Sequence, residues 1–143
     1  MATTFAPAAA PAWFRIAAFM AFVWNAFGLA MYLSAAGLFG DPTASLTEAE
    51  RAAAGAIPNW IMFAFGLGTA AGLIGSLGLV LRRRWALGML IVSAGALLVL
   101  EGWIIFLSGQ LEMHGLAIPV TVSAVAVLLV AMAAAARKRG WLR

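Results

Sequence analysis

The chain has 143 residues, a length typical of one domain, with a formal net charge of +4 and no cysteine. Hydrophobic residues make up 65% and charged residues 10%, whereas an average soluble domain is about half apolar and about a quarter charged. This composition excludes an ordinary water-soluble surface, and the lack of cysteine excludes disulfides, thiolate metal sites and a cysteine nucleophile.

Four apolar stretches of about 21–25 residues run along the chain, each long enough to cross a hydrocarbon layer of about 30 Å as a helix. Open strands cannot span lipid because their edge amides would lack hydrogen-bond partners. We therefore predict an all-α integral membrane protein, a single four-helix bundle formed by residues 1–143. The predicted spans are about residues 13–37, 58–81, 85–107 and 116–136.

The first span, about residues 13–37, follows an Ala- and Pro-rich start without charged side chains. A secretory signal needs a basic start and a short apolar core, so we expect this segment to be a retained helix. It contains Asn25 near the middle of the membrane and Tyr32 further along. These two polar residues are seven positions apart and therefore share one helix face.

The link formed by residues 38–57 is the longest between spans. Ser45 with Glu48 fits a capping box, and a run of Ala, Glu and Arg then leads to Gly55. This pattern predicts a short helix of about two turns at the membrane surface. Pro58 suits the first turn of the next helix, where its missing amide hydrogen is harmless.

The second span, about residues 58–81, has small residues at four-residue spacing: Ala64, Gly68, Gly72 and Ser76. Such a stripe lets two helix backbones approach closely, and in lipid this close contact drives helix association. The stripe predicts close packing, either within the bundle or against a second copy of the chain. The motif does not indicate any particular chemical activity.

Basic residues are distributed very unequally between the two sides of the predicted membrane spans. Arg82, Arg83 and Arg84 join the second and third spans, and alternating helices place eight of the nine basic residues on this side. The positive-inside rule then gives an up-down topology with both termini cytoplasmic, as in a multi-pass protein of a bacterial inner membrane. The other basic residues on this side are Arg15, Arg137, Lys138, Arg139 and Arg143. Topology explains these charges better than nucleic-acid binding does, and an anionic-lipid or partner site is the alternative.

Glu101 is the most informative residue, since it lies inside the third span, about 9 Å from its predicted outer end. A charged side chain within a membrane helix costs about 2.5–3.5 kcal/mol on insertion scales and marks a candidate functional site. The alternative is a structural hydrogen bond or a side chain reaching the headgroups. Thr121 of the fourth span has a similar depth, so Glu101, Asn25, Tyr32 and Thr121 could line one polar pocket.

The link between the last two spans contains Gln110, Glu112 and His114, which we interpret as an ordinary solvated loop rather than a metal site. The chain has no metalloprotease, nucleophile-elbow or phosphate-loop motif and no pair of haem-ligating histidines. We therefore expect no enzymatic activity, no metal and no cofactor.

Three short stretches carry a resemblance to a known group of proteins: Pro58–Trp60, Gly72–Gly78, and Arg82–Ala86 followed by Ser93. They resemble small four-helix bacterial inner-membrane proteins commonly labelled sugar transporters. The resemblance covers about residues 32–93 and implies small-solute transport, but it carries over no substrate site. Small multidrug transporters have their coupling acid in the first helix, where this chain has Asn25, so membership of that group is not expected.

Two functions remain open from the sequence. The first is a small-solute transporter that works as an oligomer, with Glu101 as its proton- or substrate-linked group and Asn25, Tyr32 and Thr121 lining the path. The second is an accessory or scaffolding subunit of a larger membrane complex, which the scarcity of polar groups and the small-residue stripe favour. The predicted partners are therefore the lipid bilayer and either further copies or a larger complex.

Overall fold

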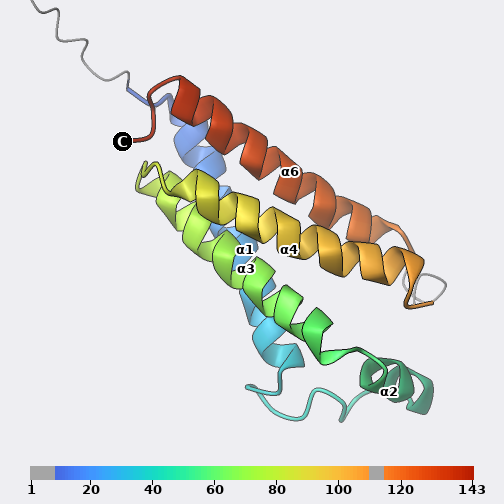
Figure 1. Ribbon diagram of the computed structural model, residues 1–143. Coiled ribbons are helices and arrows are strands. Elements are labelled where there is room, and N and C mark those ends of the chain that lie inside the picture. The colour runs from blue at the N-terminus through green and yellow to red at the C-terminus, as the bar shows by residue number, and fades with distance from the viewer. Residues whose placement is uncertain (1–8, 110–114) are drawn as a thin grey trace, which may run out of the picture.

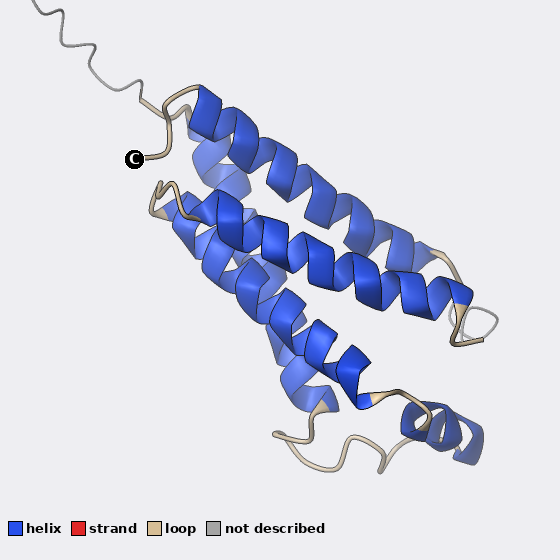
Figure 2. Ribbon diagram, in the orientation of Figure 1, coloured by secondary structure: helices blue, strands red, loops and turns tan. Residues whose placement is uncertain are grey.

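The computed structural model describes residues 9–109 and 115–143, and this part of the chain contains helices and no strands (Figures 1 and 2). The four long helices of 21–24 residues are apolar enough to cross a membrane, which is consistent with an integral membrane protein. Their bounds lie within two residues of the predicted spans. They are α1 (Ala12–Ala35), α3 (Asn59–Val80), α4 (Ala86–Phe106) and α6 (Ala117–Lys138), and a short α2 (Glu48–Gly55) joins α1 to α3.

Helix α3 is central, because α1 and α4 both pack on it while α6 packs on α4. Half of its apolar span is buried, against 17% for α1 and for α6. The small-residue stripe provides this central contact. Gly68 of the stripe lies against Leu97 of α4, and Gly75, which precedes Ser76 of the stripe, lies against Leu90, with too little space at either glycine for a side chain. The stripe therefore packs within the chain.

Helices α1 and α6 converge at one end of the bundle and diverge toward the other (Figure 1). At the convergent end Trp141, which follows α6, packs edge-on against Trp13 and tilted against Phe14 of α1. Leu142 is fully buried there. One apolar cluster joins all four long helices at this end: Phe14, Ala18, Leu79, Ala86, Leu90, Ala133, Ala136 and Leu142.

Helix α6 extends to Lys138, two residues beyond the predicted span, so Arg137 and Lys138 lie in its last turn rather than in a tail. The Trp141 amide donates to the Ala136 carbonyl at 2.9 Å, and the Gly140 amide to the Arg137 carbonyl at 3.2 Å. Gly140 has a φ of 69°. This is a Schellman motif, which satisfies the last carbonyls, and the negative end of the helix dipole favours basic side chains nearby.

Helix α3 ends with the same motif, but an arginine occupies the left-handed position. The Arg83 amide donates to the Gly78 carbonyl at 2.7 Å, and the Arg82 amide to the Leu79 carbonyl at 3.0 Å. Arg82 has a φ of 55°, which is unfavourable for a residue with a Cβ atom. The chain therefore places an arginine at a backbone position that favours glycine.

Replacing Arg82 with glycine should raise the free energy of unfolding by about 1 kcal/mol, since it removes the left-handed strain. Chemical unfolding in detergent, followed by circular dichroism, measures the change. Arg83→Gly, at the following position of the same turn, is the matched control and should not raise the free energy of unfolding. Equal effects of the two substitutions would contradict the strain argument.

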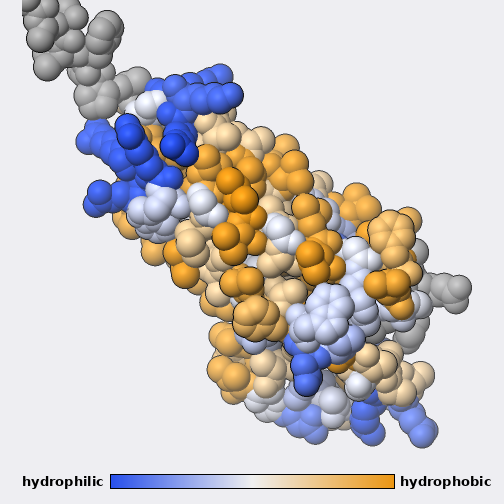
Figure 3. Space-filling model, viewed as in Figure 1, coloured by the Kyte–Doolittle hydropathy of each residue, from blue (hydrophilic) through white to orange (hydrophobic). Residues whose placement is uncertain are grey.

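The segment after α6 is tied to the turn between α3 and α4. The Arg143 amide donates to the Arg82 carbonyl at 2.6 Å, and the Arg84 amide donates to the Arg143 carbonyl at 3.0 Å. These bonds bring the basic residues of the two segments to one end of the molecule. Figure 3 shows hydrophilic residues at this end and around α2, and hydrophobic residues over the middle.

A capping box begins the short helix α2, but its residues differ from those predicted. The Glu50 amide donates to Thr47 Oγ1 at 3.4 Å, and the Thr47 amide donates to the Glu50 carboxylate at 2.8 Å. The prediction of a short helix in this link is confirmed. The predicted box at Ser45–Glu48 is wrong by two residues, because Thr47 is the N-cap.

A turn before α2 explains the later start. Asp41 accepts hydrogen bonds from the Thr43 hydroxyl at 2.7 Å and the Thr43 amide at 2.8 Å, and these bonds lower the pKa of its carboxyl. The Leu46 amide donates to the Thr43 carbonyl at 3.2 Å, and the Arg51 side chain donates to the Thr43 carbonyl at 3.2 Å and to the Leu46 carbonyl at 3.3 Å. Residues 43–46 are thereby held in a turn, so the helix begins only after them.

Candidate functional site

Three helices meet around Gly72 of α3. Asn25 of α1 and Ser93 of α4 are both buried, and both side chains lie against the bare Cα of this glycine. A Cβ at Gly72 would lie 2.8 Å from Ser93 Oγ and would overlap the Asn25 carboxamide oxygen. Two polar side chains therefore reach the middle of the bundle because the second span has no side chain at this position.

Hydrogen bonds fix both polar side chains. The Asn25 amide group donates to the Ala21 carbonyl, one turn earlier in α1, at 2.8 Å. The Ser93 hydroxyl crosses from α4 to α3 and donates to the Gly68 carbonyl at 2.7 Å. These bonds leave the Asn25 oxygen and the Ser93 lone pairs as acceptors facing the same space.

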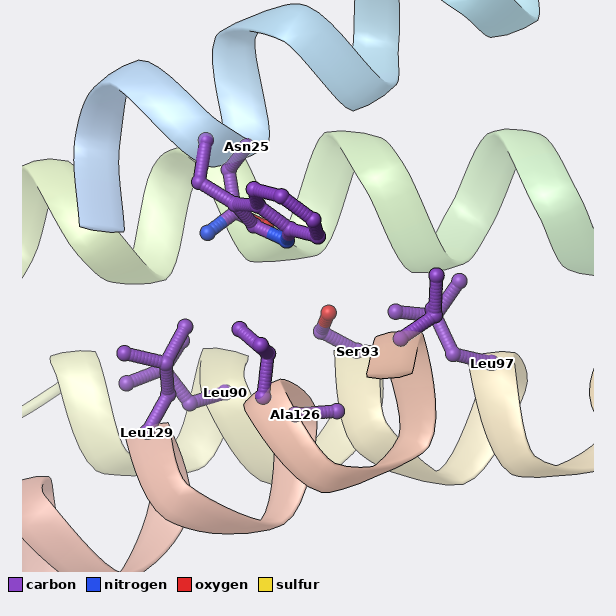
Figure 4. Close-up of a pocket in the computed structure, with 9 residues that line it drawn as sticks. Asn25, Leu90, Ser93, Leu97, Ala126 and Leu129 are labelled. Carbon is purple, nitrogen blue, oxygen red and sulfur yellow. The ribbon is translucent and has the colours of Figure 1, made fainter. Parts of the chain in front are cut away.

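A small cavity opens beside these groups (Figure 4). Its volume of about 10 Å³ is close to the minimum that holds one water molecule. Trp24, Asn25 and Ser93 are the lining residues with polar side-chain atoms, and Leu97 is among the apolar residues that line it. The cavity has room and polar partners for a single water. Its complete lining is Trp24, Asn25, Leu90, Ser93, Leu97, Val122, Val125, Ala126 and Leu129.

Glu101 lies further along α4 and is 95% buried, with a relative exposure of 5%. Its Oε2 atom is fully enclosed and accepts no hydrogen bond within the described residues. Leu97 lies four positions before Glu101 and four positions after Ser93, so it is on the same side of α4 and between them in sequence. The separation of eight positions from Ser93 to Glu101 corresponds to about 12 Å along the helix. A buried carboxyl with one unpartnered oxygen therefore lies about two turns from the water-sized cavity.

The other predicted site residues lie elsewhere. Tyr32 packs its ring edge-on against Phe65 at 5.5 Å between centroids and covers Gly66. Thr121 is exposed, and its hydroxyl donates to the Ala117 carbonyl of its own helix at 2.7 Å. Of the four residues proposed from the sequence, Asn25 alone lines the cavity described above. The structure therefore does not bring the four together in that cavity.

Ser93 is the polar residue that the sequence reasoning did not propose for the site. The sequence feature that could have identified Ser93 is its position eight residues before Glu101, which places both side chains near one face of the third span. Serine is common within membrane helices as a donor to backbone carbonyls, so the residue type alone does not indicate a site. Its hydrogen bond to the Gly68 carbonyl and its position beside Gly72 are what distinguish it.

No family model, curated protein or solved structure matches the chain. Within residues 9–109 and 115–143, no group of three or more His, Cys, Asp or Glu residues could hold a metal ion. Gln110, Glu112 and His114, which the sequence places in a solvated loop, lie outside the described residues. The buried carboxyl and the cavity are therefore the features on which a functional proposal rests.

Proposed function

We propose that the chain is a small-solute transporter of a bacterial inner membrane, with Glu101 as its proton-binding group. The observation that carries this proposal is the 95% burial of Glu101 together with its unpartnered Oε2 atom. Four apolar helices support an up-down topology with cytoplasmic termini, as does the position of Arg82–Arg84 beside the basic segment that follows α6. The resemblance of residues 32–93 to proteins labelled sugar transporters points to the same class.

The carboxyl of Glu101 can take part in proton-coupled transport because its two charge states differ strongly in their need for water. A carboxylate without a donor is costly in an apolar interior, whereas a protonated carboxyl is tolerated. Release of the proton therefore requires water or another polar group to reach the side chain. This requirement couples the protonation of Glu101 to a change in the packing around it.

The cavity near Ser93 is a second polar region that a proton or solute could use in passing through the bundle, besides the Glu101 carboxyl. Leu97 both lines this cavity and packs on Gly68, so its side chain lies between the cavity and Glu101. A cavity of about 10 Å³ accommodates water but no organic solute. Transport of a sugar-sized molecule therefore requires a second copy of the chain or an opened conformation.

Transport by the purified protein in proteoliposomes tests the proposal. An imposed proton gradient should drive uptake of radiolabelled monosaccharides by the wild type, and Glu101→Gln should reduce uptake to the level of empty liposomes. Glu48→Gln, at an exposed acid of α2, is the matched control and should transport normally. Proton-driven uptake that Glu101→Gln leaves unchanged would contradict the assigned role.

The second candidate is an accessory or scaffolding subunit of a larger membrane complex. The observation that favours it is the low burial of α1 and α6, whose apolar faces the described chain leaves mostly uncovered. A pull-down at native expression in mild detergent separates the two functions. A stoichiometric foreign partner would favour the subunit role, and a homo-oligomer would favour transport.

A further inference from the structure

A shallow apolar depression of about 630 Å³ lies on the surface of the α3–α4 hairpin. Gly88 is one of the residues that line it, and nothing comes within 4 Å of the point where a Cβ of this glycine would be. Trp85, which precedes α4, also lines it and is 45% exposed. The depression exists because a glycine replaces a larger side chain between apolar neighbours. It is lined by Ile74, Trp85, Gly88, Met89 and Val92.

Three consecutive arginines immediately precede this depression in the chain. Arg83 and Arg84 are exposed, and Arg82 is held in the left-handed backbone conformation described above. The acidic residues of the described chain lie elsewhere, at residues 41–50 and in the other half of α4 at Glu101. A positively charged group without nearby acidic side chains thus adjoins an apolar depression.

We propose that this surface binds one anionic phospholipid, with an acyl chain in the depression and the phosphate at Arg83 and Arg84. Guanidinium groups pair with phosphate through parallel hydrogen bonds, and basic surfaces beside membrane helices attract anionic lipids. Trp85 lies between the apolar and the charged part, the position that tryptophan favours at a membrane interface. The proposal rests on the membrane placement given above and is independent of transport.

A lipid fits this surface better than a second copy of the chain. Parallel copies meeting through the depression would bring two arginine triplets together, and such like-charge juxtaposition opposes association. A phospholipid instead offers the opposite charge at the arginines and a matching apolar chain beside them. The charge distribution therefore favours the lipid.

Native mass spectrometry of the detergent-purified protein tests the site with phosphatidylglycerol and phosphatidylcholine of identical acyl chains. The wild type should bind phosphatidylglycerol about tenfold more tightly. Gly88→Leu fills the depression and should lower this affinity about tenfold. Gly95→Leu is the matched control, because Gly95 lies in equally open space on the same helix outside the depression, and it should stay within twofold of wild type.

Charge-neutralised pairs test the headgroup contact. Arg83→Gln with Arg84→Gln should abolish the preference for phosphatidylglycerol. Arg137→Gln with Lys138→Gln removes two exposed charges at the same end and should retain the preference. Equal losses in both pairs, or equal behaviour of the Gly88 and Gly95 variants, would overturn the proposal. The proposal would also be overturned if glycerol 3-phosphate at equal concentration displaced phosphatidylglycerol. It would likewise be overturned if the protein formed a dimer that Gly88→Leu abolished.

Discussion

Replacing Gly72 with alanine should lower the free energy of unfolding by about 1–3 kcal/mol, the range for overpacking a close-packed interior. The added methyl group would overlap the Asn25 carboxamide and approach Ser93 Oγ at 2.8 Å. Neither side chain can move freely, because Asn25 is bonded to the Ala21 carbonyl and Ser93 to the Gly68 carbonyl. The substitution therefore breaks a hydrogen bond or separates the helices.

A matched control isolates this clash from the general effect of alanine on a helix. Alanine is more favourable than glycine in a helix interior by about 1 kcal/mol. At Gly95 nothing lies within 4 Å of the added methyl group, so Gly95→Ala should be neutral or stabilising. Chemical unfolding in one detergent, followed by circular dichroism, compares the two variants. A Gly72→Ala protein as stable as Gly95→Ala would show that α1, α3 and α4 do not meet at Gly72.

Double substitution tests which contact is responsible. Asn25→Ala in the Gly72→Ala background removes the overlapping carboxamide and should recover part of the lost stability. A double-mutant cycle should give a coupling of about 0.5–3 kcal/mol, as for residues in direct contact. A coupling near zero would mean that the added methyl group acts through Ser93 instead.

The four long helices were predictable because crossing a lipid bilayer imposes a simple requirement on length and hydropathy. Each predicted span lies within two residues of an observed helix. One difference of two residues is at the end of α6, where Gly140 closes the helix after Lys138. Hydropathy ends a span at its first charge, whereas the helix ends where its last carbonyls find donors. Arginine and lysine are favourable in that last turn, so the helix continues through them.

The polar contacts were less predictable because they depend on how each helix is rotated. Apolar residues lie on every side of helix α4, so its sequence does not show which face meets α3. Ser93 and Thr121 are both hydroxyl residues of membrane spans, yet Ser93 crosses to Gly68 while Thr121 bonds within its own helix. A hydroxyl that satisfies itself one turn back can face lipid without penalty. Residue type and depth therefore did not distinguish these two positions.

Glu101→Leu should stabilise the protein by about 1–3 kcal/mol and at the same time abolish transport. Its Oε2 atom is enclosed without a hydrogen-bond partner in the described chain, and a buried unsatisfied polar group costs about that much. Leucine has a similar size and suits the neighbouring apolar side chains Leu97 and Leu100 of the buried face. Chemical unfolding and proteoliposome uptake measured on one preparation give both quantities.

The two quantities together separate a functional from a structural carboxyl at this position. A structural role requires Glu101 to bind a donor, so its removal would leave that donor unpaired and destabilise the fold. A functional role keeps a destabilising residue for the sake of activity, so its removal should stabilise the fold and end transport. Ser93→Ala is the internal comparison, since it removes a hydrogen bond to Gly68 and should destabilise the protein by about 1 kcal/mol. A Glu101→Leu protein that loses stability as Ser93→Ala does would identify Glu101 as a structural residue, and the proton-binding role would then be wrong.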